Sequence, residues 1–244
     1  MAPLSLRDCL GFHPDGKLER VHLAGIPFDA SGKPVNVLQE WDQELDLGGK
    51  FFRPAGWDEC FPTIDPYLGS PVMGELIGLP PEMNWQEDRV EQIWRTPRFE
   101  ARRCFRLATP ACLEMDFQAI CLQETPLDYL WASHCLLGVE NLQKMCLASG
   151  DEYRHFDHDA SEKKIFVVNP GPVELDYLYF RVVLTTDQPY WGLWINRGGW
   201  PANCHPALRC LGVEATNTAG EIPAGQRLDP GAIFTGKVRF EIHS

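Results

Sequence analysis

The sequence lacks long hydrophobic runs, an excess of basic residues and a secretion signal. No stretch approaches the ~20 consecutive apolar residues that a membrane-spanning helix needs. The opening segment MAPLSLRDCLGFHPDG has no apolar core between a basic head and a cleavage site. Asp and Glu outnumber Lys and Arg by 34 to 22, which gives a net charge of −12 and no basic stripe to neutralise a phosphate backbone or an anionic membrane. We therefore expect a cytoplasmic protein with no nucleic-acid partner and no membrane partner.

Motifs for metal and redox chemistry are also missing. The nine cysteines form no Cys-x-x-Cys pair, and several lie in or beside apolar runs, which indicates buried, reduced thiols. His155 and His158 have the spacing of metal ligands on a helix, but the polar stretch around them indicates a solvated loop. The sequence predicts no metal site.

Frequent turn residues and alternating patterns indicate a mainly β protein. The 21 Gly and 20 Pro are scattered at short intervals, which suits many short strands better than a few long helices. Between residues 113 and 121 apolar and polar side chains alternate, as in a half-buried strand. Thr109-Pro110 fits a hairpin connection in front of it. Further strands are expected at 127–132, 174–184, 191–196 and 238–242.

Other segments carry different signals. The first 50 residues alternate less regularly, and we expect short edge strands there. Residues 142–148 are expected to form a short helix, and residues 149–164 one long loop. No repeat, low-complexity tract or charge run marks a boundary, so the sequence predicts one domain over residues 1–244.

Four segments combine aromatic, acidic and imidazole side chains next to turn signals, where loops present side chains to a cleft. They are GWDECFPTIDPY (56–67), YLWASHCLLGVE (129–140), YWGLWINRGGWP (190–201) and CLGVEATNTAG (210–220). The first offers Trp57, which can cover the apolar face of a sugar ring. It also offers Asp58 and Glu59, whose carboxylates accept hydrogen bonds from sugar hydroxyls. An inward-packing turn explains the same residues equally well.

The other three segments supply an imidazole, aromatic rings and a carboxylate. His134 can act as a general acid near neutral pH, although a histidine among apolar neighbours is more often a hydrogen-bonded core residue. Three tryptophans lie close to an Asn and an Arg in the third segment, a density that favours ligand contact over packing alone. Glu214 either caps a turn or points into a site as a base whose pKa desolvation raises. Both alternatives stay open at the level of sequence.

In this order the segments resemble the aldose 1-epimerase or galactose mutarotase-like family. The parallels are Gly48-Gly49 followed by Phe61-Pro62, Gly74-Glu75-Leu76 followed by Trp85, the runs LWASH, GLWINRGGWP and GVEATN, and the closing LDPGAIFTGKVRFEI. They cover roughly residues 45–244, and their order is more specific than any single motif. The resemblance implies a large twisted antiparallel β-sandwich with few short helices, and a sugar held in an open groove across one sheet.

The resemblance also implies chemical roles. His134 matches the family's acid, which protonates the ring oxygen, and Glu214 matches the base, which takes the proton of the anomeric hydroxyl, so that the ring opens, rotates and recloses. Proton transfer suffices for this reaction, which implies no cofactor. The partner implied is a small-molecule sugar or sugar derivative. The expected sugar contacts are Arg53, Trp57, Asp58, Glu59, Asn196, Arg197 and Trp200.

One position departs from the family. Met73 precedes Gly74 where members usually carry a histidine, and a thioether neither donates a hydrogen bond nor carries an imidazolium charge. Arg53, Asp58 and Glu59 are the candidates to replace that contact. The leading hypothesis is an isomerase that interconverts sugar anomers. The alternative is a non-catalytic carbohydrate-binding or regulatory protein on the same fold. The sequence names neither the sugar, nor its charge, nor the oligomeric state.

Overall fold

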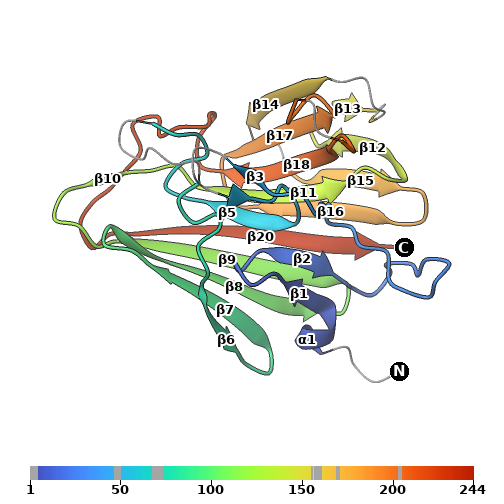
Figure 1. The fold of residues 1–244 in the computed structure, drawn as a ribbon, viewed down its shortest axis with the longest axis horizontal. Coiled ribbons are helices and arrows are strands. Elements are labelled where there is room, and N and C mark those ends of the chain that lie inside the picture. Colours follow the sequence, from blue (N-terminus) through green and yellow to red (C-terminus); the bar gives the residue numbers. More distant parts are fainter. Residues whose placement is uncertain are drawn as a thin grey trace.

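Two large antiparallel sheets dominate the computed structural model, which describes residues 5–46, 51–67, 74–154, 156, 161–168, 171–202 and 205–244 (Figure 1). The strand order of the seven-stranded sheet is β1 (Leu10–Phe12), β2 (Leu18–Val21), β5 (Trp57–Cys60), β11 (Ala132–Gly138), β18 (Arg209–Thr216), β17 (Tyr190–Arg197) and β14 (Glu162–Val168). The order of the nine-stranded sheet is β13 (Glu152–Tyr153), β12 (Leu142–Leu147), β15 (Val173–Tyr177), β16 (Arg181–Thr186), β20 (Ile233–His243), β9 (Cys112–Cys121), β8 (Phe99–Thr109), β7 (Arg89–Arg95) and β6 (Glu82–Trp85).

The remaining elements are small. They are the helix α1 (Leu6–Cys9) and the strand pairs β3 (Leu45–Asp46) with β4 (Phe51–Phe52) and β10 (Leu127–Asp128) with β19 (Arg227–Leu228). Within the ranges described, none of the helices is long and apolar enough to cross a membrane. The predicted mainly β class is confirmed.

Aromatic side chains join the two sheets. Trp57 of β5 contacts Phe105 of β8 and Phe240 of β20, with ring centroids 5.6 and 6.1 Å apart. Trp131, next to β11, stacks on Phe117 of β9 at 5.4 Å. In every pair one ring comes from the seven-stranded sheet or its flank and the other from the nine-stranded sheet. The sheets therefore pack face to face around one aromatic core, which confirms the predicted β-sandwich.

The expected hairpin is present, because β8 and β9 pair on either side of Thr109-Pro110. Other expectations are wrong. Residues 127–132 are not one strand, because β10 ends at Asp128 and β11 begins at Ala132. Residues 174–184 are not one strand but the hairpin β15–β16, whose strands separate at residues 178–180. The expected helix at 142–148 is strand β12, since pairing with β15 buries alternate apolar side chains of this short run. A run of six residues satisfies helix and strand patterns alike, and tertiary pairing decides between them.

The expected loop at 149–164 also contains strand residues. Glu152–Tyr153 forms β13, and β14 begins at Glu162. Both are the outermost strands of their sheets. An outermost strand keeps one side in solvent, so it carries polar side chains and gives a weak hydrophobic signal.

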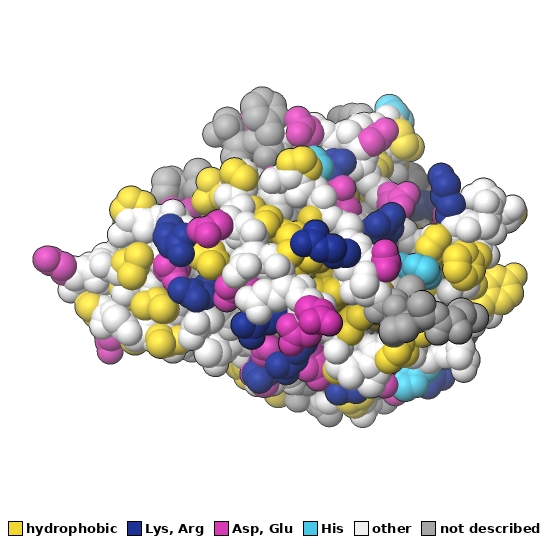
Figure 2. Space-filling view, turned by 90° about the horizontal axis from the view of Figure 1, so that it is seen from below, with side chains coloured by type: hydrophobic (Ala, Val, Ile, Leu, Met, Phe, Trp, Pro, Cys, Tyr) yellow, Lys and Arg dark blue, Asp and Glu magenta, His cyan; other side chains and the backbone are white. Residues whose placement is uncertain are grey.

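The surface carries interspersed charges on the face that Figure 2 shows. Arg106 pairs with Glu114 at 2.8 Å, and Arg239 pairs with the same Glu114 at 3.4 Å. Basic side chains on this face alternate with acidic ones and form no continuous basic area (Figure 2).

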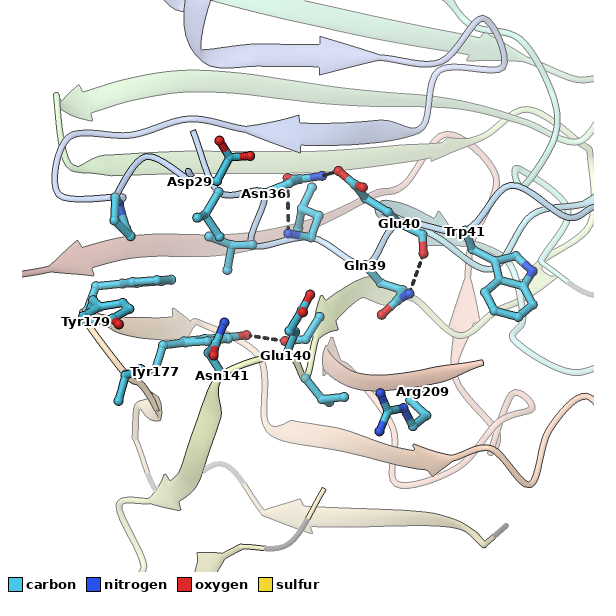
Figure 3. Close-up of a pocket in the computed structure, with 18 of the residues that line it drawn as sticks. Asp29, Asn36, Gln39, Glu40, Trp41, Glu140, Asn141, Tyr177, Tyr179 and Arg209 are labelled. Carbon is cyan, nitrogen blue, oxygen red and sulfur yellow. Dashed lines mark hydrogen bonds between the residues drawn. The ribbon is translucent and has the colours of Figure 1, made fainter. Parts of the chain in front are cut away.

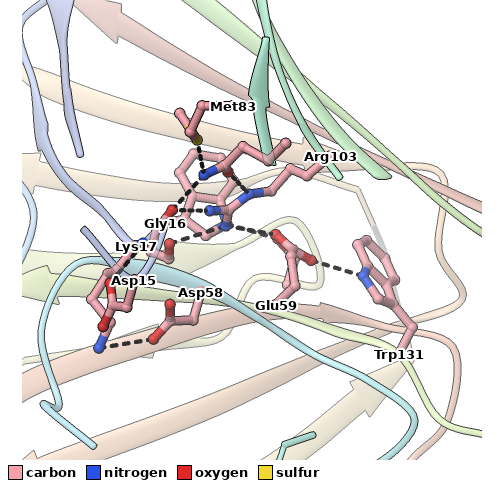
Figure 4. Close-up of polar contacts among 11 residues, drawn as sticks. Asp15, Gly16, Lys17, Asp58, Glu59, Met83, Arg103 and Trp131 are labelled. Atoms are coloured by element: carbon pink, nitrogen blue, oxygen red, sulfur yellow. Dashed lines mark hydrogen bonds and ion pairs between the residues drawn. The ribbon is translucent and has the colours of Figure 1, made fainter. Parts of the chain in front are cut away.

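A buried arginine links the sheets through polar contacts (Figure 4). The guanidinium of Arg103, on β8, donates to the Trp57 carbonyl at 3.1 Å, to the Gly16 carbonyl at 2.8 Å and to the Gln92 side chain at 2.7 Å. Its Nη1 also lies 3.4 Å from Glu59 Oε1. Arg103 therefore satisfies carbonyls and a carboxylate of elements that belong to both sheets.

Glu59 accepts further hydrogen bonds from β11 and its flank. Trp131 Nε1 donates to Oε2 at 2.8 Å, and the Ser133 hydroxyl donates to Oε1 at 3.1 Å. Burial raises the pKa of Glu59 to about 7, while the Arg103 charge and these hydrogen bonds oppose the rise. The carboxylate is thus held in the core by partners on three sides, and it is sensitive to the loss of its cation.

We predict that Arg103→Met destabilises the fold by about 3–5 kcal/mol, because it leaves the Glu59 carboxylate buried without its cation. The raised pKa of Glu59 means that the protonated form is favoured in the folded state, so this deficit should be larger at pH 8 than at pH 5.5. Urea unfolding at both pH values measures it. The control is Arg106→Met on the same strand, where the pair with Glu114 is half exposed and should contribute less than about 1 kcal/mol. Equal losses in the two variants would contradict the prediction.

Candidate functional site

Strand register places polar side chains in one row across the seven-stranded sheet. Asp58 of β5 is paired with His134 of β11, His134 with Glu214 of β18, and Glu214 with Gly192 of β17. Side chains alternate along a strand, so this row lies on the face turned away from the nine-stranded sheet, which we call the outer face. Trp57 lies on the opposite face of β5 and belongs to the core.

Glu214 is the centre of the row. Its side chain is fully buried, and Lys164 of β14 donates to both of its oxygens, at 2.6 and 2.8 Å. His134 Nε2 lies 3.4 Å from Glu214 Oε1. The fold therefore brings together the imidazole and the carboxylate that the sequence analysis selected, and it adds an ammonium group.

Two glycines make room for the carboxylate. A Cβ at Gly212 would lie 3.0 Å from Glu214 Oε1, and a Cβ at Gly192 would lie 3.4 Å from Oε2. Both glycines are on the outer face, one on the same strand as Glu214 and the other directly across from it. Larger side chains at these two positions would crowd the carboxylate. Glycine therefore leaves room for the Glu214 side chain to lie close to the backbone of the sheet.

Burial and charge set the protonation states of the two partners of Glu214. Burial lowers the pKa of His134, and the Lys164 charge lowers it further while the Glu214 carboxylate opposes the shift. The imidazole is therefore neutral at pH 7. Burial would lower the pKa of Lys164, but the charge and hydrogen bonds of Glu214 outweigh it and raise that pKa, so the ammonium stays charged. Among the described residues, His134 Nδ1 has no hydrogen-bond partner.

Asp58 is held in a second ion pair. Lys17 Nζ lies 2.9 Å from its carboxylate, and both side chains are almost fully buried. The same ammonium group donates to the Arg53 carbonyl and lies over the ring of Phe52. Asp58 thus stands beside His134 with its charge already balanced.

A cavity of about 240 Å³ opens over His134, and it has an aromatic wall. Glu214 lies beside His134 and is not itself part of the cavity lining. Trp194 and Trp200 line it, with their ring centroids 5.4 Å apart and their planes at 74°. Trp194 also lies beside the imidazole of His134, at 6.2 Å between centroids, and donates through Nε1 to Glu162 at 2.7 Å. The cavity therefore combines flat apolar surfaces with the imidazole.

Charged side chains line another part of the cavity, next to the apolar Phe52, Cys60, Ile64 and Ile77. The charged groups are Lys164, which reaches it from β14, and the carboxylates of Asp65, Glu162 and Glu221. Besides its contact with Glu214, Lys164 Nζ lies 3.5 Å from Glu221 Oε1. Burial raises the pKa of Glu221, and the positive charge of Lys164 opposes this rise. An aromatic wall with hydrogen-bonding groups at its base suits a small polyhydroxylated ligand.

Several of the selected residues lie elsewhere. Glu59 is in the core with Trp57, on the face opposite to the cavity. Arg53 forms an ion pair with Glu19. Asn196 is buried and fixes the loop that carries Trp200, because it donates to the Trp200 carbonyl at 2.5 Å and accepts from its amide at 3.2 Å. Arg197 donates to the Ser161 hydroxyl at 3.3 Å. Of the seven selected sugar contacts, Trp200 lines the cavity, and all seven roles stay predictions.

Four charged residues around the cavity were not predicted from the sequence: Asp65, Glu162, Lys164 and Glu221. Asp65 lies within the segment GWDECFPTIDPY, and Glu221 directly follows CLGVEATNTAG, so proximity to these segments was a usable signal. Lys164 and Glu162 lie where a loop was expected, and only the pairing of β14 with β17 brings them over Glu214.

Three positions of the sequence analysis, Met73, His155 and His158, lie outside the described residues. Over the ranges that are described, no cluster of three or more His, Cys, Asp or Glu side chains is arranged to hold a metal ion.

Comparisons with known proteins relate the chain to solved structures only. No protein-family model and no curated protein matches the sequence. A protein of Synechocystis sp. PCC 6803 is similar with a TM-score of 0.65 and 14% identity, covering 100% of this chain and 96% of that one. A galactose mutarotase-like protein of Lactobacillus casei is similar with a TM-score of 0.64 and 14% identity, and the match covers 96% of both chains. An aldose epimerase homologue from C. elegans is similar with a TM-score of 0.60 and 12% identity, and the match covers 96% of this chain and 95% of that one.

These similarities extend over nearly the whole of both chains in each comparison. Because the sequence identity is low, they establish the fold alone. The resemblance inferred from the order of sequence motifs is thereby confirmed at the level of architecture. The chain has the galactose mutarotase-like fold.

Proposed function

We propose that this protein binds a sugar in the cavity on the outer face and interconverts its anomers. The observation that carries the proposal is the contact between His134 Nε2 and Glu214 Oε1, at 3.4 Å, at the base of a cavity walled by two tryptophans. The anomeric hydroxyl and the ring oxygen of a pyranose are bonded to the same carbon. An acid and a base that serve these two oxygens must therefore be close neighbours, as these two side chains are.

The chemistry is a pair of proton transfers. Glu214 takes the proton of the anomeric hydroxyl while a protonated His134 donates a proton to the ring oxygen, and the bond between the anomeric carbon and the ring oxygen breaks. His134 gains that proton once the sugar displaces Lys164 from Glu214, because the Lys164 charge lowers the imidazole pKa and the Glu214 carboxylate raises it. The open-chain aldehyde rotates about its first carbon–carbon bond. The same two groups then act in reverse, so that the ring closes with the other face of the carbonyl exposed to the hydroxyl. Neither residue is changed at the end of the cycle.

Lys164 has a part in this scheme, because it covers the base. Its ammonium group holds both oxygens of Glu214, and sugar binding must free one of them for the anomeric hydroxyl. Glu221, 3.5 Å from Lys164 Nζ, is a second carboxylate that can accept the displaced ammonium. Until then Lys164 pairs with the carboxylate of the buried Glu214.

The charges favour a sugar without anionic groups. Asp65, Glu162 and Glu221 line the cavity, and Lys164 is already engaged by Glu214 and Glu221. A phosphate or carboxylate on the sugar would meet these carboxylates in a partly desolvated space, where like charges repel strongly. The proposed substrate is a neutral aldose.

The second candidate function is sugar binding without turnover. It is favoured by the complete burial of Glu214 beneath Lys164, which leaves the base without a free oxygen in the unliganded protein. If Lys164 stays in place when a sugar binds, the cavity recognises the sugar but cannot open its ring.

We predict that Glu214→Gln abolishes anomerisation while sugar affinity changes little, because the amide keeps the shape but cannot take the proton. His134→Asn should lower the rate in the same manner, less completely. A positioned acid or base contributes about 10²–10⁴-fold in rate, so losses of that size should appear in kcat without a matching rise in KM. Exchange NMR or polarimetry on pure anomers measures the rates.

The matched control for these variants is Glu114→Gln, which removes a partly exposed carboxylate of the nine-stranded sheet and should leave the rate unchanged. A parent protein that binds sugar but never exceeds the rate in buffer would refute catalysis and leave the binding function. A parent protein that is folded but binds no sugar of a broad panel would refute both candidates.

We further predict that glucose, galactose or mannose is processed with a kcat/KM at least about tenfold above that of its 6-phosphate, because of the carboxylates in the cavity. The double variant Asp65→Asn/Glu162→Gln should narrow this difference by improving the phosphorylated sugar. Gln keeps the acceptor for Trp194 Nε1, so the aromatic wall should be preserved. A preference for the 6-phosphate would overturn the assignment of a neutral substrate while leaving anomerisation itself intact.

A further inference from the structure

A second and larger hollow lies at the end of β11 and β18 (Figure 3). Its volume is about 870 Å³, and we call it the terminal groove. Segments far apart in the sequence line it, namely residues 27–30, 35–41, 138–141 and 177–180, together with Arg209. The proposed catalytic pair is not part of its lining.

Exposed aromatic and aliphatic side chains gather along this groove. Phe28 is 63% exposed, Leu178 is 52% exposed and Tyr179 is 71% exposed. They come from two different lining segments. Large apolar side chains that share one exposed hollow indicate a surface that binds something, since isolated exposure would scatter them.

The polar groups of the groove suit a neutral, hydroxyl-rich ligand. In the part of the chain that the structure describes, the side chains of Glu140, Asn141 and Arg209 form no hydrogen bond or ion pair, so a carboxylate, an amide and a guanidinium are open to a ligand. The carboxylate of Asp29 is occupied by Ser31 and the Lys33 amide.

The charges of the groove argue against an anionic ligand. Three carboxylates, those of Asp29, Glu40 and Glu140, line it together with the guanidinium of Arg209. Glu40 Oε1 accepts from the neutral side chain of Asn36 at 3.0 Å, which leaves its charge in place. Aromatic faces beside such mixed donors and acceptors match the apolar C–H faces and hydroxyls of a sugar.

The terminal groove lies near the cavity of the proposed site, and one buried apolar cluster separates the two hollows. Trp41, which lines the groove, packs against the apolar cluster of Leu136, Trp194, Leu208 and Cys210, and Trp200 packs against the same cluster from the cavity. Gly138 of β11 lines the groove and lies on the same face as His134, four residues further along the strand. Four residues of a β-strand span about 13 Å. The two hollows are thus neighbours along one strand.

We infer that the terminal groove holds the outer units of a reducing oligosaccharide whose reducing-end unit occupies the cavity, an inference that rests on the proposed function. Only the reducing-end unit of such a chain has a free anomeric hydroxyl, so only that unit can be opened at His134 and Glu214. The remaining units must leave the cavity, and the terminal groove beyond Trp41 is the neighbouring hollow that can receive them. The protein then acts on short neutral glycans and not on monosaccharides alone.

The test compares glucose and mannose with reducing malto-, cello- and manno-oligosaccharides of two to four units, by calorimetric binding and by exchange NMR of the reducing end. At least one series should bind about tenfold more tightly than the monosaccharide at its reducing end. The double variant Phe28→Ala/Tyr179→Ala should remove that gain and leave monosaccharide binding and anomerisation unchanged. The matched control is Ile233→Ala, an apolar side chain 54% exposed on β20 and outside the groove.

Two sets of results would overturn the inference. One is affinity that does not grow with chain length in any series, or a gain that survives the double variant. The other is a change in oligomeric state of the double variant in sedimentation velocity, because the groove would then be a contact between copies of this chain. Failure of the proposed catalysis has a different signature, since no reducing end would then be anomerised faster than in buffer, whatever the affinity for oligosaccharides.

Discussion

The hydrogen-bond register of β5, β11 and β18 is the constraint on which the rest of the structure depends. It sets Asp58, His134 and Glu214 side by side on the outer face and at the same time turns Trp57 and Glu59 into the core. A slip of one residue would exchange the two faces and bury the chemistry among aromatic rings. The aromatic contacts between the sheets hold this register, because only one face of each strand fits them.

Strand β5 shows how closely the two faces are coupled. Its adjacent carboxylates, Asp58 and Glu59, point to opposite sides, and each has its own buried cation: Lys17 on the outer face and Arg103 in the core. Two charges on neighbouring residues are therefore balanced separately. The core pair fastens the strand between the sheets, while the outer pair places a neutralised carboxylate beside His134 and limits the electrostatic influence of Asp58 on the imidazole.

Lys164 connects the stability of the site with its chemistry. A buried carboxylate needs a cation, and Lys164 supplies it with two short hydrogen bonds. The same contact hides the group that the proposed reaction needs. In the proposed reaction, binding energy from the tryptophan wall must therefore drive the exchange of Lys164 between Glu214 and Glu221. Turnover and simple binding differ in this one rearrangement, and the row of side chains beneath it is the same for both.

The sequence by itself determined the β class, the β8–β9 hairpin and the choice of His134 and Glu214, because alternation and motif order are local properties of the chain. It misassigned residues 142–148 and 149–164, where short or polar strands depend on their neighbours for pairing. It assigned Glu59 to the same sugar-binding site as Asp58, although adjacent side chains of a strand point to opposite faces of the sheet. Only the tertiary structure brought Lys164 onto Glu214, since β14 reaches that position by pairing with β17 across a long stretch of chain. Contacts between distant strands have no local signature, and the charge balance of the site is made of such contacts.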